Sequence, residues 1–154
     1  MKIYVHHEGQ PEAEAVEVVP EGPLRELVGP VTGQPVVLLE DGDEELDLER
    51  TFAALGIVER AHVFVGQRHR IDVEVLFNGE PRTETFSAST RVSRVFRWAV
   101  GGKGFDLSEA DAAEHTLVLA SDIAPPGDTH LGSLDDATPG RVAFRLIPKH
   151  RYEG

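Results

Sequence analysis

The sequence predicts an α+β fold made of two similar halves, each a mixed β-sheet with one helix packed across it. Three observations lead to this prediction. Strand-like apolar segments recur in the same order in both halves, polar turns separate them, and each half has one segment with apolar residues at helical spacing. A length of 154 residues therefore corresponds to two small domains, although one domain is the usual expectation for this length.

Each half opens with two strands joined by a turn. In the first half, residues 2–6 alternate between apolar and polar, and a return strand is expected around residues 16–18. In the second half, the alternating segment 70–77 is followed by Asn78-Gly79, which is a strong signal for a tight hairpin. Residues 80–87 are then expected to form the return strand.

A helix follows each pair of strands. Ser89 is the expected N-cap of the second helix, and Gly101-Gly102 is expected to end it. A shorter helix is expected in the first half, with Pro23 in its first turn and Gly29-Pro30 at its end. The second helix is defined by apolar residues that share one face: Val92, Val95, Phe96 and Ala99.

Each half closes with a strand, a loop that contains a short helical turn, and a last strand. We therefore expect one domain over residues 1–67, a second over residues 71–147, and a flexible tail over residues 148–154, because Pro148 lacks the N–H that a sheet ladder needs. The matched segments are 37–39 with 117–119, 47–55 with 128–134, and 61–65 with 141–145.

Composition excludes several classes of function. Without cysteine there is no disulfide, no thiolate-bound metal and no cysteine nucleophile. A net charge of −12 argues against nucleic-acid binding, and no apolar run is long enough to span a membrane. Residues 40–45 lack the calcium-loop spacing, and His6 and His7 point to opposite faces of a strand. We therefore expect no catalytic residue, no metal site, no cofactor and no enzymatic activity, in a cytoplasmic protein.

The order of elements resembles the ubiquitin-like β-grasp fold, present twice in tandem. The likeness is strongest in the second half, over residues 117–120, 127–134 and 142–146. Two such domains followed by a tail that ends in glycine are similar to two-domain ubiquitin-like modifiers, and among them to the BilA modifiers of bacterial ubiquitination-like antiphage operons. The resemblance covers nearly the whole chain.

This resemblance implies how the tail is used. An activating enzyme adenylates the terminal carboxylate with ATP, which the modifier itself does not bind. Activating and conjugating enzymes then carry it as a thioester to an amine of a target protein, and a JAB-type protease removes it. Gly154 is the implied conjugation residue, because glycine lacks a Cβ and passes a narrow channel. Unlike ubiquitin, which ends in two glycines, this chain has Glu153 before its last residue. The tail residues expected to be recognised are Lys149, His150, Arg151, Tyr152 and Glu153.

Two further groups of residues are candidates for a partner surface. Val118 and Ala143 stand where ubiquitin-like folds often expose an apolar patch on the sheet. Arg91, Arg94 and Arg97 recur every third residue and are expected to line the outer face of the helix, where an ordinary solvated face is the alternative interpretation. Residues 1–67 hold 14 acidic and 4 basic side chains, whereas residues 68–154 hold 13 and 11. We therefore expect the second half to contact the conjugation enzymes.

Two other functions fit the same pattern. The chain is alternatively a non-covalent tandem ubiquitin-like adaptor, whose tail has no chemical role. It is also compatible with a β-grasp sulfur carrier, in which the terminal carboxylate becomes a thiocarboxylate. Such carriers usually have one domain and end in two glycines, so this third possibility fits least well.

Overall fold

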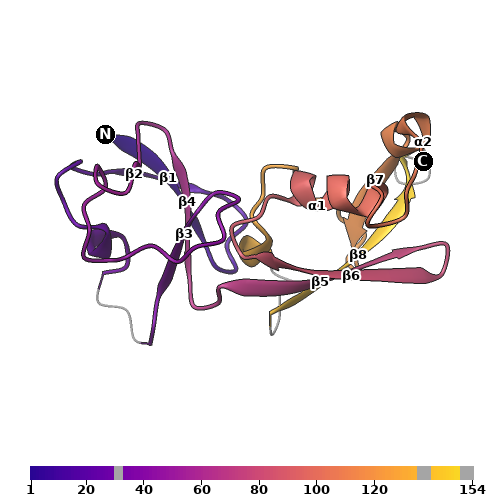
Figure 1. Cartoon of the computed structure of the whole chain (residues 1–154), viewed down its shortest axis with the longest axis horizontal. Helices are drawn as coiled ribbons and strands as arrows, with labels where there is room; N and C mark the ends of the chain where they lie inside the picture. The colour runs from indigo at the N-terminus through magenta and orange to yellow at the C-terminus, as the bar shows by residue number, and fades with distance from the viewer. Residues whose placement is uncertain (30–32, 135–139, 150–154) are drawn as a thin grey trace.

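A computed structural model describes residues 1–29, 33–134 and 140–149, and it places them in two four-stranded sheets that lie side by side (Figure 1). The first sheet ends at Gly66 and the second begins at Arg70. The polar segment between them is therefore short, as the sequence indicated. No strand of one sheet pairs with a strand of the other in the described part of the chain.

The first sheet has a parallel pair of strands at its centre and an antiparallel strand on each side. Its order is β2-β1-β4-β3, in which β1 and β4 are the parallel pair. The alternation predicted for residues 2–6 is observed, because Ile3 and Val5 are buried in the core of the first half. The four strands are β1 (Lys2–His7), β2 (Glu14–Glu17), β3 (Val36–Leu39) and β4 (His62–Gly66).

The second sheet repeats this arrangement strand for strand. Its order is β6-β5-β8-β7, and β5 and β8 form the parallel pair. The hairpin at Asn78-Gly79 is confirmed, with φ angles of 52° and 82° that belong to a type I′ turn. The four strands are β5 (Arg70–Phe77), β6 (Glu80–Ser87), β7 (His115–Leu119) and β8 (Arg141–Pro148). The internal repeat therefore extends to topology, and the predicted pair of α+β domains is confirmed.

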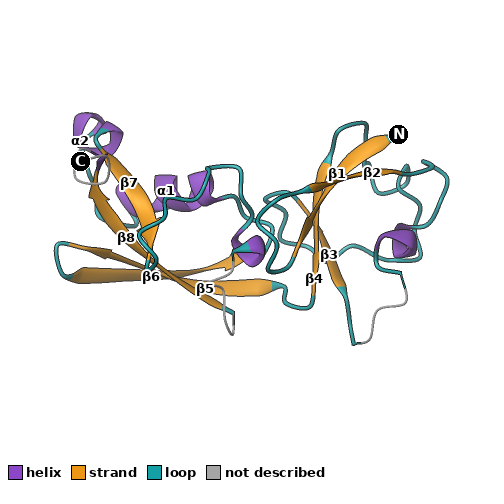
Figure 2. Ribbon diagram, turned by 180° about the vertical axis from the view of Figure 1, so that it is seen from behind, coloured by secondary structure: helices purple, strands orange, loops and turns teal. Residues whose placement is uncertain are grey.

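The helices differ more between the halves than the strands do. The second half has the expected helix, α1 (Val92–Val100), whose apolar face packs on the sheet (Figure 2). In the first half the corresponding segment is a single 3-10 turn, η1 (Leu24–Leu27), which buries Leu24. A second 3-10 turn, η2 (Leu131–Ser133), lies where a short helical turn was expected. Helix α2 (Glu109–Ala113), capped by Ser108, was not predicted.

The N-terminus of α1 differs from the prediction in an instructive way. Its N-cap residue is Arg91 and not Ser89. The backbone N–H of Arg91 donates to the carboxylate of Asp41, at an N–O distance of 2.9 Å, and Asp41 belongs to the first half. Ser89 instead donates its hydroxyl to the carbonyl of Gly42, at 3.0 Å. An acidic side chain from one domain thus accepts from the N-terminus of the helix of the other, where it also interacts favourably with the helix dipole.

The two domains meet across a packed junction. Side chains of β4 alternate, so that Val63 enters the core of the first domain while Phe64 joins the core of the second. Val36 and Leu38 of β3 join the second core in the same way. A Cβ added to Gly132 would lie 2.4 Å from the Phe64 ring, so this close approach requires glycine.

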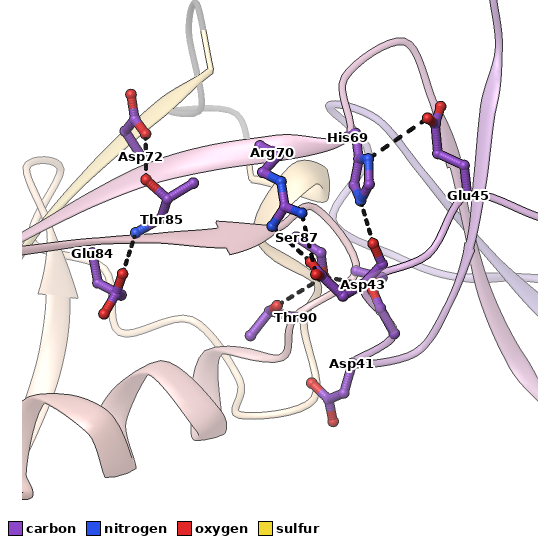
Figure 3. A network of polar contacts seen from close by, with 12 residues as sticks. Asp41, Asp43, Glu45, His69, Arg70, Asp72, Glu84, Thr85, Ser87 and Thr90 are labelled. Atoms are coloured by element: carbon purple, nitrogen blue, oxygen red, sulfur yellow. Dashed lines mark hydrogen bonds and ion pairs between the residues drawn. The ribbon is translucent and has the colours of Figure 1, made fainter.

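Polar contacts surround this apolar contact. The Arg70 guanidinium donates to both carboxylate oxygens of Asp43, at 2.7 and 3.1 Å, in the two-pronged arrangement visible in Figure 3. Backbone bonds also cross the junction, from Asp41 N–H to Ser89 C=O at 3.0 Å and from Gly9 N–H to Gly132 C=O at 3.0 Å. These contacts fix the two domains relative to each other.

Candidate functional site

The outer face of the second sheet is the surface on which the predicted partner residue Ala143 lies. Ala143 is exposed on β8, opposite Glu74 of β5, and Glu74 faces Thr83 of β6 in turn. Around Glu74 and Thr83 the sheet forms a shallow depression of about 440 Å³, which Ala143 itself does not line. The depression is lined mainly by polar and charged side chains: Asp72, Glu74, Thr83, Glu84, Thr85 and Arg141. This face is therefore suited to a polar partner surface rather than to a large apolar one.

Val118 does not belong to this exposed surface, and this part of the prediction is wrong. It pairs with Arg145, which is exposed on β8, but the Val118 side chain has no exposed area. The alternation of β7 places Leu117 and Leu119 in the core and turns Val118 to the other face, as the sequence indicated. Because Val118 is covered on that face too, a partner has no access to it.

The three arginines of α1 do not act as one stripe. Arg91 donates through its guanidinium to Asp41, with N–O distances of 2.7 Å, and Arg94 donates to the Asp41 carbonyl at 3.0 Å. The hydrogen bond that Arg91 donates to Asp41, and the charge of Asp41, raise the pKa of Arg91 above its ordinary value. Arg97 is exposed and lies beside Trp98 and Lys103 around a shallow hollow. Two of the three arginines therefore stabilise the junction, and Arg97 is left facing solvent.

The outer face of the first sheet is partly covered by the second domain, which buries His6 and Phe64 but leaves Tyr4 and His62 half-buried. Tyr4, His6, His62 and Phe64 share that face, where Tyr4 stacks on His62 and His6 stacks on His130 of the second domain. The equivalent residues of the second sheet are exposed or half-buried. Of the two related sheet faces, the one on the second domain is the one open to a partner.

The predicted tail lies mostly outside the described residues. Strand β8 extends to Pro148, one residue into the predicted tail, and Lys149 N–H still donates to Glu114 C=O at 2.8 Å. The side chain of Lys149 is exposed and borders a cavity of about 290 Å³ between α1, α2 and β7. The other predicted tail residues fall outside the described part of the chain: His150, Arg151, Tyr152, Glu153 and Gly154.

The residues that join the domains were missed by the sequence analysis. Asp41 and Asp43 belong to an acidic turn that was interpreted only as a connection between strands. Asp41 has a positive φ of 58°, which aspartate tolerates better than most residues, and its carboxylate reaches across the junction. The hydrogen bond from Arg70 holds the pKa of Asp43 below its ordinary value. His130 and Gly132 meet the first domain from η2 and the residue before it, and no local signal in the sequence points to those contacts.

The junction also gathers side chains that can bind a metal. His6, Glu40 and His130 each place one potential ligand atom within 4.8 Å of the others. They come from β1, from the turn after β3 and from the residue before η2. The sequence analysis considered His6 only with its neighbour His7, and the residues that meet it are 34 or more positions away.

Comparisons with known proteins agree with this architecture. A family model described as BilA ubiquitin-like domain 2 matches residues 72–149, just over half of the chain and nearly all of the second domain. No curated protein matches the chain. Within the described residues, no helix is long and apolar enough to cross a membrane. With its two β-grasp sheets and this match, the chain belongs to the BilA family of ubiquitin-like proteins.

Proposed function

We propose that the chain is a ubiquitin-like modifier that becomes conjugated through the carboxylate of Gly154 to amines of a target protein in bacterial antiphage defence. The observation that carries this proposal is the family match over residues 72–149, because that family is one of ubiquitin-like modifiers. The matched domain ends five residues before Gly154. The chain is then a substrate of conjugation enzymes in the cytoplasm and has no enzymatic activity of its own.

The chemistry proposed for Gly154 needs an activated carboxylate. The activating enzyme transfers AMP from ATP to the carboxylate and releases pyrophosphate, and an enzyme thiolate then displaces AMP to give a thioester. A lysine amine of the target finally displaces the thiolate and forms an amide. This chain has no cysteine, so it is the acyl group that is carried and not the carrier. A glycine at the reacting position leaves the carbonyl open to each nucleophile.

Placement of the open sheet face supports contact with these enzymes through the second domain. β5 and β8 run parallel, and β5 begins at Arg70, which contacts Asp43 across the junction. Both strands therefore lead away from the first domain (Figure 1), and Lys149, just after β8, donates its N–H to the carbonyl of Glu114 at the end of α2. In this proposal an enzyme that takes the tail also contacts the face around Ala143, while a JAB-type protease releases the modifier from its target.

Conjugation is tested with the full chain, ATP and purified activating and conjugating enzymes of a BilA-type system. Trypsin cleaves after Arg151, so a modified target lysine carries the branch Tyr-Glu-Gly from residues 152–154, which mass spectrometry identifies. We expect Gly154→Val to reduce conjugation at least tenfold. Gly102→Ala is the matched control, because a Cβ at Gly102 meets no atom within 4 Å. Unchanged conjugation by Gly154→Val refutes the proposal and favours the non-covalent adaptor, and a terminal thiocarboxylate identifies a sulfur carrier.

The proposed enzyme surface has its own test. Ala143→Arg places a large charged side chain on the exposed face, next to Glu74, its partner on β5. We expect KM for the activating enzyme to rise several-fold, with the free energy of unfolding changed by no more than about 0.5 kcal/mol because the site is on the surface. An unchanged KM in a folded variant refutes the role of this face and leaves conjugation through Gly154 standing.

A further inference from the structure

A cluster of histidines with one glutamate lies where the two domains meet. His6 comes from β1, His62 from β4 and Glu40 from the turn after β3, whereas His130 belongs to the second domain. His130 Nε2 and a Glu40 carboxylate oxygen are 2.9 Å apart, and His6 Nε2 and His62 Nδ1 are also 2.9 Å apart. The rings of His6 and His130 stack, with centroids 3.6 Å apart and planes inclined by 10°. One contiguous cluster therefore connects the domains.

Three members of this cluster have the composition of a zinc site. His6, Glu40 and His130 offer two imidazole nitrogens and one carboxylate oxygen within 4.8 Å of one another. Two histidines and one glutamate are a ligand set that Zn²⁺ takes in proteins, with a fourth position filled by water or a further side chain. Ligand atoms around tetrahedral zinc lie roughly 3.3 Å apart for bonds of about 2.0–2.1 Å. Binding thus requires side-chain movements that bring the three ligand atoms closer together.

The electrostatic surroundings favour a cation. The carboxylates of Glu40, Asp41 and Asp128 act on these histidines, and Arg91 is the cation that faces the same cluster, 3.8 Å from Glu40. Negative charge therefore exceeds positive charge around the three ligands. A divalent cation would balance that excess, and a bound cation is often the largest local charge in such a site.

The histidines hold their lone pairs at neutral pH. Burial, and then the charge of neighbouring histidines, lower the pKa values of His6 and His130 to about 4, so both rings are neutral. A metal binds neutral imidazole, and no proton has to be displaced from a charged ring. The His130 side chain has no exposed area, and its Nδ1 has no hydrogen-bond partner among the described residues. Nε2 is the His130 nitrogen that faces Glu40, so it is the atom through which His130 would share a metal with Glu40.

We propose that His6, Glu40 and His130 form a zinc site that crosslinks the two ubiquitin-like domains. His62 acts as a positioning residue, because its bond to His6 orients that ring, as outer partners commonly orient metal-bound histidines. Two ligands come from the first domain and one from the second, so bound zinc holds the domains in one arrangement. The site is independent of Gly154 and does not require conjugation to take place.

The test uses the full chain, freed of metal with EDTA and titrated with Zn²⁺ alone in a calorimeter. Two matched pairs of variants separate the site from ordinary surface groups. His6→Asn is compared with His7→Asn, its neighbour on the other face of β1, and Glu40→Gln is compared with Glu45→Gln in the same acidic segment. Circular dichroism in EDTA checks folding. Glu40 is about a quarter exposed, so Glu40→Gln remains informative if His6→Asn fails to fold.

We expect one Zn²⁺ per chain in the wild type and in both control variants, with affinity at least tenfold lower in His6→Asn and Glu40→Gln. Co²⁺ provides a second readout, since it should give the intense visible bands of a tetrahedral ion in the wild type and lose them in Glu40→Gln. Zn²⁺ should also raise the unfolding temperature of the wild type and leave that of Glu40→Gln unchanged. The proposal is overturned if Zn²⁺ binding is the same in Glu40→Gln as in the wild type, or if the wild type binds no stoichiometric Zn²⁺.

Discussion

The Asp41 carboxylate is the junction contact whose removal can be predicted in most detail. One oxygen accepts the Arg91 backbone N–H at 2.9 Å, and the other accepts the guanidinium Nε–H at 2.7 Å and forms an ion pair with Nη2, also at 2.7 Å. Asp41→Asn keeps the shape of the side chain and tolerates the positive φ of 58°. It also keeps one acceptor for the backbone N–H, but it turns an amide NH₂ toward the arginine. The charge-assisted hydrogen bond from Nε and the ion pair with Nη2 are therefore lost.

The expected loss in the free energy of unfolding follows from those two interactions. Hydrogen bonds to charged groups contribute about 1.5–3 kcal/mol each when well buried. The Asp41 and Arg91 side chains are 19% and 37% exposed, so solvent screening reduces their contribution. We expect Asp41→Asn to lower the free energy of unfolding by about 1–2 kcal/mol. Asp106→Asn is the matched control, because Asp106 also has a positive φ and its side chain is exposed, and we expect a change below about 0.5 kcal/mol.

The assay is urea unfolding of Asp41→Asn, Arg91→Met and the double variant, followed by circular dichroism. The double-mutant cycle isolates the pair from the weaker contact between Arg91 and Glu40. We expect a coupling energy of about 1 kcal/mol and one shared unfolding transition for the two domains in the wild type. A coupling energy below about 0.3 kcal/mol would mean that the contact does not join the domains energetically, and the reasoning would be refuted.

Two further predictions concern the same junction. Gly132→Ala should lower the free energy of unfolding by about 2–3 kcal/mol, because the new Cβ overlaps the buried Phe64 ring, whereas Gly102→Ala should have little effect in the same denaturation experiment. An equal effect at both glycines would contradict the packing argument. Arg70→Gln should raise the pKa of Asp43, measured by carboxylate ¹³C NMR, since the Arg70 hydrogen bond lowers that pKa. The contribution of this pair to stability is then present above the carboxyl pKa of the unfolded chain, and it is lost as the pH falls through the pKa of Asp43 in the folded chain. An unchanged Asp43 pKa in Arg70→Gln would show that the Arg70 hydrogen bond is not what lowers it.

Local signals were sufficient to predict the strands. The Asn78-Gly79 pair specifies its turn by itself, and β5 and β6 have the predicted bounds. The helices were less predictable. Segment 24–27 forms a single 3-10 turn and not the expected helix. Helix α2 buries none of its residues, so its sequence has no apolar periodicity from which it could be predicted. A prediction from periodicity finds elements that bury one face, and it misses those that do not.

The junction was not predictable because its partners are far apart in the sequence. Asp41 and Arg91 are 50 positions apart, and Glu40 and His130 are 90 apart. No periodic pattern carries information across such distances. Val118 illustrates the same limit on a smaller scale, since alternation gave its direction correctly but did not reveal that it would be covered. For the candidate surface residues, the sequence predicts which face of the sheet a side chain points to, but only the folded structure shows whether that side chain is accessible.

The junction decides which surfaces of a two-domain modifier a partner can use. Because part of the outer face of the first sheet packs on η2 and the residue before it, the sheet face of the second domain is the more accessible of the two. The parallel strands β5 and β8 then carry the end of the second domain away from the junction, so the first domain does not obstruct access to Lys149. The first domain holds most of the net negative charge, with 14 acidic and 4 basic residues over positions 1–67. Held in one arrangement by Asp41, Asp43 and Phe64, that charge has a fixed direction relative to the tail, so it can orient an approaching basic partner as well as attract it.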